Sequence, residues 1–261
     1  MDDVVLLTGA QGAIGSMLRR SLRRPGRHLR LLDVAPLSPL EPGEDAELVS
    51  GSFLDSDVLS DACRGANAIV HMGGLSHEGY TWAEYLEVNI HGTYLLAEAA
   101  REAGVERIVY ASSNHAVGFA PLRDDGVVPD YEFPRPDTYY GVSKAASENV
   151  LSLYHDRYGL DVVCLRIGSY REEPIDVRSL WSWLSPGDCA RLVDASLTTP
   201  RPGFRIVWGV SANARAAVSL EEGRAIGYEP RDNAEDYASI LTDTHDQWHD
   251  VGGRYTGPDV T

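Results

Sequence analysis

Short apolar runs alternate with longer helical patterns over the first two-thirds of the chain, and this alternation restricts the fold more than any other feature. Six runs rich in β-branched residues are typical of strands, and a seventh run, Glu47–Ser50, is weaker. The six runs are Val4–Thr8, Leu29–Asp33, Ala68–His71, Arg107–Ser112, Val162–Ile167 and Arg205–Trp208. Helical patterns lie between them, among them Trp82–Ala103, for which we expect Gly104 to be the C-cap. The six runs are almost continuously apolar, as expected of strands that helices cover on both faces. The sequence therefore predicts an α/β fold with a doubly wound parallel sheet.

A glycine-rich turn lies between the first expected strand and the first expected helix, Ile14–Arg23. Its three glycines permit a tight turn, a close approach of the backbone to a pyrophosphate, and close packing of helix on strand. The start of the helix adds N–H donors and the positive end of its dipole. The expected cofactor contacts are Gly9, Gln11, Gly12, Ala13, Ile14 and Gly15. This arrangement predicts a dinucleotide site of the Rossmann type.

Asp33 ends the second expected strand, 18 residues after Gly15. A carboxylate at this place accepts hydrogen bonds from both ribose hydroxyls and repels a 2′-phosphate. We therefore predict NAD rather than NADP as the cofactor. The alternative is an aspartate that only caps a helix or a turn.

The rhythm of the sequence changes after Gly168, where prolines divide the chain into shorter pieces. We expect residues 1–169 to form a Rossmann core that carries the cofactor and catalytic residues. Residues 170–261 are expected to form a small C-terminal substrate-capping region that includes the late strand, within one structural unit. The tail from Asp243 onward is polar, so we expect it to be loosely held.

Tyr140 and Lys144 stand four residues apart, a spacing that places both on one face of a helix. Of the chain's 23 basic residues, Lys144 is the only lysine. Its ammonium stabilises a neighbouring phenolate, so the spacing predicts that Tyr140 is a general acid/base. Tyr139 stands five residues from Lys144 and turns to another face. Chance remains the alternative explanation for a single lysine.

A polar segment that contains Ser113 follows the expected strand Arg107–Ser112 at its carboxyl end, where open α/β sheets hold ligands. A serine hydroxyl there can bind the reacting oxygen beside a tyrosine. We therefore predict a catalytic set of Ser113, Tyr140 and Lys144. The alternative is a serine that caps the end of the strand.

Charge and cysteine content exclude several classes of partner. The formal net charge of −16 argues against nucleic acid and anionic membranes. No apolar run approaches the ~20 residues needed to span a bilayer. The three cysteines are scattered without a close pair, which indicates a reducing cytoplasm. His71 and His77 lack a third ligand at a spacing suited to a metal, so we expect no metal site. The expected partner is a small molecule, with a homo-oligomer left open.

These motifs together resemble the extended short-chain dehydrogenase/reductase superfamily. Within that superfamily the chain is similar to the uronate dehydrogenase family over nearly its whole length, to about Tyr237. The similarity is carried by the stretches 71–76, 112–118, 166–169, 207–213 and 227–235.

The resemblance implies oxidation of the anomeric hydroxyl of a hexuronic acid, glucuronate or galacturonate, to the aldarolactone, with reduction of NAD. It implies that Tyr140 removes the hydroxyl proton, that Lys144 supports the phenolate and binds the nicotinamide ribose, and that Ser113 orients the oxygen. It also implies substrate contacts at Ser76, Ser113, Asn114, His115, Ser169 and Arg178. In this family an arginine at the place of Arg178 grips the substrate carboxylate, a task that suits its forked donors.

Two departures from the family pattern and three alternative functions remain open. Ser52 and Phe53, which we expect to contact the adenine, stand where the family has an aspartate–leucine pair, with Asp55 two places further on. Residues 170–174 also carry more charge than expected near a sugar. An NAD-dependent glucose-6-phosphate dehydrogenase on the same scaffold is the nearest alternative. A sugar epimerase or dehydratase is less favoured, because the C-terminal region is short. A regulatory protein that binds NAD without turnover would not need the tyrosine–lysine pair.

Overall fold

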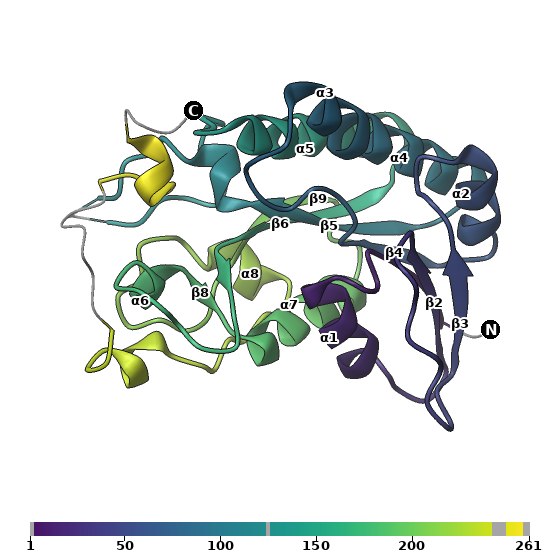
Figure 1. Cartoon of the computed structure of the whole chain (residues 1–261), viewed down its shortest axis with the longest axis horizontal. Coiled ribbons are helices and arrows are strands. Elements are labelled where there is room, and N and C mark those ends of the chain that lie inside the picture. Colours follow the sequence, from purple (N-terminus) through teal and green to yellow (C-terminus); the bar gives the residue numbers. More distant parts are fainter. Residues whose placement is uncertain (1–2, 124–125, 242–248, 258–261) are drawn as a thin grey trace. The chain divides into compact units, whose positions relative to one another are not determined.

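The computed structural model describes residues 3–123, 126–241 and 249–257. Its main sheet has seven strands in the order β3-β2-β1-β4-β5-β6-β9 (Figure 1). These are β1 Asp3–Thr8, β2 Arg27–Asp33, β3 Ala46–Ser50, β4 Ala68–His71, β5 Arg107–Ser113, β6 Asp161–Ile167 and β9 Phe204–Gly209. All seven predicted strands are therefore confirmed, each to within two residues at either end.

The remaining elements connect or follow these strands. The α-helices are α1 Ala13–Ser21, α2 Ser56–Cys63, α3 Trp82–Glu84, α4 Gly92–Ala103, α5 Tyr139–Tyr158, α6 Ser179–Ser182, α7 Pro186–Thr198 and α8 Glu221–Ala225. One π-helix, η1 Tyr85–His91, and three short 3₁₀ helices, η2 Asn114–Val117, η3 Ala234–Tyr237 and η4 Gly253–Thr256, accompany them. Two short strands, β7 Ser169–Tyr170 and β8 Trp183–Leu184, pair with each other. Within the described residues, no helix is long and apolar enough to cross a membrane.

The predicted helix Trp82–Ala103 consists of three segments. The first segment is α3, whose N-terminus is capped by a capping box of Thr81 and Glu84. The π-helix η1 follows, and the last segment is the α-helix α4. It ends at Gly104, whose φ of 72° is a left-handed conformation that glycine adopts at low cost. The predicted C-cap is therefore confirmed, whereas the π-helix was not predicted.

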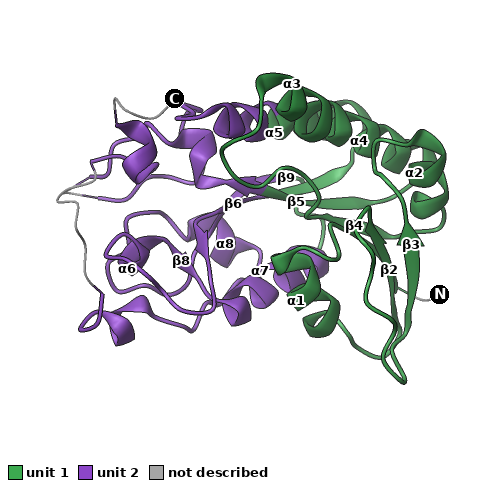
Figure 2. Cartoon of the chain, in the orientation of Figure 1, with its two compact units in different colours: residues 1–111, 147–163, 200–204 green, residues 112–146, 164–199, 205–261 purple. Residues whose placement is uncertain are grey.

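The chain divides into two compact units (Figure 2). One comprises residues 1–111, 147–163 and 200–204, and the other comprises residues 112–146, 164–199 and 205–261. The two units interleave along the chain, and the division at residue 169 remains a prediction.

The first unit contains the point at which the order of the strands reverses. From β1 the chain proceeds outward to β2 and β3, and then returns to β4 on the other side of β1. Because parallel crossovers are right-handed, this reversal places successive helices on opposite faces of the sheet. Figure 1 shows α1 on one face of these strands, with α2 and α4 on the other. The carboxyl ends of β1 and β4 therefore border the crevice in which such sheets bind ligands.

The second unit has an apolar core that includes the end of the chain. Trp181 and Trp208 pack there together with Val117, Val128 and Val251, and Val251 is fully buried. The expectation of a loosely held tail is therefore wrong for residues 249–257. Hydrogen bonds to residues far back in the sequence hold this part of the tail, and residues 242–248 and 258–261 lie outside the described part of the chain.

Candidate active site

The glycine turn after β1 has the close backbone packing that a phosphate cradle requires. Gly9 has a φ of +67°, and a Cβ there would lie 2.7 Å from the backbone N of Gly73. A Cβ on Gly15 would lie 2.0 Å from the carbonyl oxygen of Gly9. Gly12 is the N-cap residue of α1, so the first N–H groups of that helix follow it directly. These three positions fit a pyrophosphate at the start of α1.

Side chains on β1 and β4 hold the two sides of this crevice together. The Thr8 hydroxyl accepts a hydrogen bond from the Gly73 N–H at 3.2 Å and lies 2.6 Å from His71 Nδ1. His71 is almost fully buried, and its ring packs edge-on against Phe53. His71 therefore belongs to the sheet's interior. Among the described residues, no group of three or more potential metal ligands occurs.

Asp33 at the end of β2 is oriented by two backbone N–H groups. Its Oδ2 accepts from Gln11 in the glycine turn, and its Oδ1 accepts from Ala35, both at 2.9 Å. A carboxylate has about four acceptor positions, so these bonds leave capacity for ribose hydroxyls. The carboxylate thus fits the ribose contact that was predicted from the sequence.

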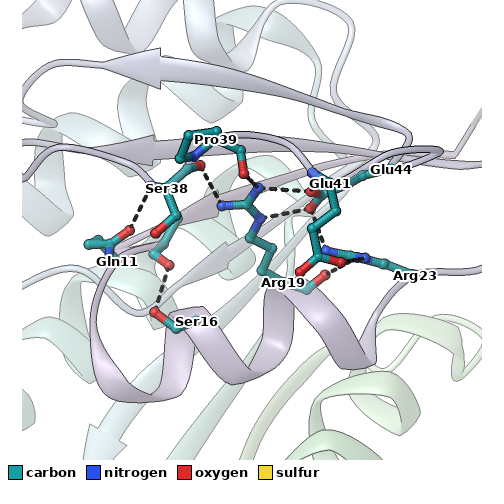
Figure 3. Close-up of polar contacts among 9 residues, drawn as sticks. Gln11, Ser16, Arg19, Arg23, Ser38, Pro39, Glu41 and Glu44 are labelled. Carbon is teal, nitrogen blue, oxygen red and sulfur yellow. Dashed lines mark hydrogen bonds and ion pairs between the residues drawn. The ribbon is translucent and has the colours of Figure 1, made fainter.

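A polar network around Arg19 holds the loop that follows Asp33 (Figure 3). The Arg19 guanidinium forms two hydrogen bonds with Glu44, at 2.7 and 2.8 Å, and donates to the carbonyl oxygens of Ser38 and Pro39. The Ser38 N–H in turn donates to the Gln11 side chain. The Arg19 and Glu44 side chains are 9% and 1% exposed, and the ion pair lowers the pKa of Glu44 to about 2. Helix α1, the glycine turn and residues 34–45 are therefore tied together at the adenosine end of the predicted cofactor site.

Two cofactor contacts suggested by family resemblance lie before α2. Phe53 packs against Gly73 and Gly92, where added Cβ atoms would lie 2.8 and 2.5 Å from its ring. The Ser52 hydroxyl accepts from the Leu54 N–H at 3.0 Å. Asp55 caps α2 by accepting from two backbone N–H groups of the first turn. A capping role explains Asp55, and the adenine contacts of Ser52 and Phe53 remain predictions.

Asn89 is a residue of this unit that sequence reasoning missed. Its side-chain amide brackets Leu75, accepting from the Leu75 N–H at 2.8 Å and donating to the Leu75 carbonyl at 3.0 Å. Asn89 lies in the π-helix η1, and its backbone carbonyl accepts hydrogen bonds from the hydroxyl groups of Thr93 and Ser147. The predicted substrate residue Ser76 is exposed and directly follows the bracketed residue. Asn89 thereby fixes the loop that carries Ser76.

The second unit places the tyrosine and the lysine on one face of α5, as predicted. The Lys144 Nζ lies 5.6 Å from the centroid of the Tyr140 ring, and both side chains are buried. The neighbouring Tyr139 is 64% exposed, against 8% for Tyr140. Thr138 precedes the helix, and its hydroxyl accepts from the Gly141 N–H at 3.0 Å. The four-residue spacing therefore selected the correct one of two adjacent tyrosines for this face.

The residues that follow β5 pack directly against the start of α5. The Ser113 hydroxyl accepts from the His115 N–H at 3.2 Å, so Ser113 does cap the turn η2. A hydroxyl that accepts a backbone bond can still donate to a substrate oxygen. Gly141 allows the close approach, because a Cβ there would lie 2.2 Å from the His115 carbonyl oxygen. Ser113, His115 and Tyr140 thus lie in one part of the unit.

His115 has a carboxylate partner that sequence reasoning missed. Its Nδ1 lies 2.8 Å from Oδ2 of Asp137, whose side chain is fully buried. The imidazole also packs edge-on against the rings of Tyr140 and Tyr255, with centroids at 6.0 and 5.1 Å. A carboxylate bound at Nδ1 fixes the orientation of the imidazole ring.

Arg178 is surrounded by neutral oxygen acceptors. Its Nη1 donates to the Ser169 hydroxyl at 3.1 Å, and its Nη2 donates to the Val251 carbonyl at 2.7 Å. The Asn114 amide satisfies its surroundings when its oxygen accepts from Arg178 Nη2 at 2.8 Å and its nitrogen donates to Ile167. The structure therefore brings together three predicted substrate residues, Asn114, Ser169 and Arg178.

No carboxylate within the described parts of the chain lies within ion-pair distance of this guanidinium. Its Nε is fully buried and has no hydrogen-bond partner among the described residues. Burial lowers the pKa of Arg178, and Trp181 stacks against the guanidinium at 5.1 Å. Asp176 and Asp137 act on this charge only from a distance, so the buried cation has donors that an anion could bind directly.

Comparison with known proteins identifies a family and several similar sequences. The model of the NAD dependent epimerase/dehydratase family matches residues 5–170. A uronate dehydrogenase of Pseudomonas putida is 40% identical over 237 residues, covering 91% of this chain and 87% of the relative. An NAD-dependent glucose-6-phosphate dehydrogenase of Haloferax volcanii is 35% identical over 254 residues, covering 91% and 96%.

A solved structure extends the similarity to the whole fold. A mutant uronate dehydrogenase of Agrobacterium tumefaciens, complexed with NAD, has a TM-score of 0.89 and 35% sequence identity. The alignment covers 98% of this chain and 97% of that one. The resemblance stated from the sequence is thereby confirmed.

Proposed function

The chain belongs to the NAD dependent epimerase/dehydratase family, and within that family we propose that it oxidises the anomeric hydroxyl of a hexuronic acid. The hydroxyl proton leaves to a base and the C1 hydrogen leaves as hydride, so that a C1 carbonyl forms and the product is an aldarolactone. NAD supplies the hydride acceptor and becomes NADH. The proposal rests on the similarity to uronate dehydrogenases and on the residues that follow.

The guanidinium of Arg178 is the observation that carries the choice of a uronic acid. It is desolvated, its described hydrogen-bond partners are neutral oxygens, and its Nε has no acceptor. A planar carboxylate supplies the missing negative charge and can accept two parallel N–H bonds. A neutral sugar would leave the guanidinium without a directly bonded anion, with only the more distant charges of Asp176 and Asp137 acting on it. We therefore infer that the substrate carries its carboxylate to Arg178, with Ser169 and Asn114 at the same place.

The residues of the first unit support NAD as the cofactor. The close-packed glycines at Gly9 and Gly15 fit a pyrophosphate, and Asp33 fits the two hydroxyls of an unphosphorylated ribose. A 2′-phosphate would bring a second negative charge to the Asp33 carboxylate. We therefore assign Gln11, Gly12, Ala13 and Ile14 to the phosphate contacts at the start of α1, as the family resemblance implies.

Tyr140, Lys144 and Ser113 supply the proton chemistry of the proposal. The Tyr140 phenolate accepts the proton of the anomeric hydroxyl, and the nearby Lys144 ammonium stabilises the phenolate. Ser113 donates a hydrogen bond to the same substrate oxygen and keeps it in line with Tyr140. The burial of Tyr140 and Lys144 strengthens their interaction, because it reduces screening by water.

His115 and Ser76 complete the proposed sugar contacts. Asp137 binds the Nδ1 side of His115, so Nε2 is the atom that can reach a ring hydroxyl. Ser76 lies on the loop that Asn89 holds.

Placement in the cytoplasm also remains a proposal. The burial of Cys63, Cys164 and Cys189 as thiols supports it, since reduced cysteines suit a reducing compartment.

A substrate panel tests the proposal directly. Purified protein is mixed with NAD and, in separate reactions, with glucuronate, galacturonate, glucuronamide, glucose-6-phosphate or arabinose, and NADH is followed by its absorbance. We expect turnover with the two uronates and little with the neutral glucuronamide, which matches glucuronate in shape but lacks its charge. Equal rates with glucuronate and glucuronamide would refute the role of Arg178.

The Haloferax relative favours glucose-6-phosphate as the second candidate substrate. The same anomeric oxidation would occur, with a phosphate dianion in place of the carboxylate. Turnover with glucose-6-phosphate and with neither uronate would replace the first proposal by this one. Absence of NADH with every sugar would point to an epimerase, a dehydratase or a binding protein instead.

A further inference from the structure

Backbone hydrogen bonds join the last described segment, residues 249–257, to residues 118–122, which follow the 3₁₀ helix η2. The Leu122 N–H donates to the His249 carbonyl, and the Val251 N–H donates to the Ala120 carbonyl, at 2.7 and 2.9 Å. The Gly252 N–H donates to the Gly118 carbonyl at 2.8 Å. These bonds join parts of the chain that lie about 130 residues apart in sequence, and they fix the backbone of residues 249–252.

Residues Val251–Tyr255, the C-terminal strap, contact Arg178 from one side. The Val251 carbonyl accepts from Arg178 Nη2 at 2.7 Å. Gly253 has a φ of +61°, and a Cβ there would lie 2.8 Å from Cδ of Arg178 and 2.9 Å from its Nε. The backbone of the strap therefore lies directly against the guanidinium, in a conformation and a space that both favour glycine.

The same strap contacts the His115–Asp137 pair. A Cβ on Gly252 would lie 1.8 Å from Asp137 Oδ2, the oxygen that binds His115 Nδ1. The Tyr255 ring meets the His115 imidazole edge-on, with centroids 5.1 Å apart and an interplanar angle of 87°. The Tyr255 hydroxyl accepts from Nη2 of the neighbouring Arg254 at 2.6 Å. The strap thus contacts Arg178 through Gly253, His115 through the Tyr255 ring, and the His115 partner Asp137 through Gly252.

We propose that the C-terminal strap is a specificity-determining part of the substrate site, in which Gly253 and Val251 position Arg178 and Tyr255 positions His115. The strap fixes the guanidinium relative to the imidazole, and therefore selects cyclic sugars whose anionic group and ring hydroxyl match that separation. This inference rests on the function proposed above for the same site. Tyr255 and Gly253 act through their neighbours and are positioning residues.

The first test is a glycine substitution with a matched control. Gly253→Ala introduces a methyl group against Arg178, whereas Gly227→Ala introduces one at a φ of +87° with no atom within 4 Å. Both variants carry similar backbone strain, so a difference between them reports the contact with Arg178. We expect Gly253→Ala to raise the KM for glucuronate about tenfold or more, because displaced donors lose charge-assisted bonds. The KM for NAD should stay within about twofold in both variants.

The second test uses the ring of Tyr255. Tyr255→Leu removes the aromatic edge, and we expect the KM for glucuronate to rise roughly three- to tenfold. Tyr255→Phe keeps the ring and should restore most of the wild-type KM. Thermal unfolding of each variant shows whether it is folded. If both Tyr255 variants and Gly253→Ala keep the wild-type KM for sugar, or if the KM values for sugar and NAD rise in parallel, the inference is wrong.

The substrate panel separates failure of this inference from failure of the proposed function. The variants are compared on whichever sugar the wild-type protein oxidises. If wild type oxidises glucose-6-phosphate or arabinose and neither uronate, the proposed function is wrong, and the strap is tested with that sugar. If wild type oxidises none of the sugars, both the function and the inference are overturned.

Discussion

Replacing Glu44 by glutamine should lower the free energy of unfolding, and the pKa shift of Glu44 gives the approximate size of the loss. Glu44 is the acidic partner of Arg19 in the network that holds residues 34–45 (Figure 3). The substitution keeps the size of the side chain and removes its charge. The Arg19 guanidinium then remains buried with only the carbonyl oxygens of Ser38 and Pro39 as strong acceptors.

The expected loss follows from the pKa of Glu44. Hydrogen bonding and ion pairing with Arg19, together with the Glu41 N–H and the Arg23 charge, lower that pKa from 4.5 to about 2. One pKa unit corresponds to about 1.4 kcal/mol, so these interactions together stabilise the folded state by about 3 kcal/mol. Removal of one partner from a buried ion pair costs a similar ~3–5 kcal/mol. At roughly 2–4 °C per kcal/mol for a chain of this size, the Tm should fall by about 6–12 °C at pH 7.

The sign of the pH dependence follows from the same shift. Because the pKa of Glu44 is lower in the folded protein, its contribution to the free energy of unfolding is fully present above the unfolded value near 4.5. It decreases as the pH falls toward about 2, where the carboxyl becomes protonated in the folded state as well. The stability difference between wild type and Glu44→Gln should therefore shrink between pH 4.5 and 2.

Urea unfolding of both proteins from pH 7 down to about pH 2 measures this difference. The control is Glu235→Gln, which removes the acid of another two-bond arginine–glutamate pair, that of Arg215 and Glu235, on the exposed surface. We expect no resolvable change from the control, because exposed pairs contribute little. Equal stability of wild type and Glu44→Gln at pH 7, or an undiminished difference near pH 2, would refute the reasoning. The KM for NAD should rise in Glu44→Gln while the KM for uronate stays constant.

Three further substitutions test the assigned roles. Tyr140→Phe should abolish nearly all turnover and leave NAD affinity intact, as measured by equilibrium binding; a largely retained rate would show that the base lies elsewhere. Arg178→Met should raise the KM for glucuronate about a hundredfold, since charge-assisted bonds contribute about 1.5–3 kcal/mol each, and an unchanged KM would exclude the carboxylate contact. Asp33→Asn should weaken NAD and relax the bias against NADP. Equal use of the two cofactors by wild type would contradict the role of Asp33.

Sequence alone was sufficient for the features that local pattern determines. The central strands β1, β4, β5 and β6 were predictable because they are largely buried, so their apolar runs are nearly continuous and unlike their surroundings. The edge strand β3 is only partly buried, and its run was correspondingly weaker. The glycine turn was predictable because the backbone packs so closely at Gly9 and Gly15 that a Cβ at either position would overlap neighbouring backbone atoms. The choice of Tyr140 over Tyr139 followed from helical spacing alone, and the exposure of Tyr139 agrees with it.

Features that depend on distant parts of the chain were not predictable in this way. Asp137 reaches His115 across 22 residues, and no local pattern marks an aspartate between two prolines and a helix as a histidine partner. The π-helix that carries Asn89 has the same apolar spacing as an ordinary helix, so the sequence showed one continuous helix. The polar tail looked weakly held because its anchor is mainly backbone hydrogen bonding, which does not depend on apolar side chains.

Two desolvated arginines, Arg19 and Arg178, differ in their hydrogen-bond partners. This difference distinguishes an arginine that stabilises the fold from one that we propose binds the substrate. Arg19 has a bidentate carboxylate partner from its own chain, so its charge is compensated in the absence of any ligand. Arg178 has only neutral described hydrogen-bond acceptors and an Nε without one, and Asp176 and Asp137 compensate its burial only from a distance, so we expect a bound anion to add the missing direct partner. If this reasoning holds, saturating glucuronate should raise the Tm of wild type but not of Arg178→Met, since ligand binding stabilises only the state that binds it. Because Glu44→Gln leaves Arg178 intact, that variant should keep the full glucuronate-induced rise despite its lower Tm. Loss of the rise in Glu44→Gln as well would mean that the two arginines are not independent.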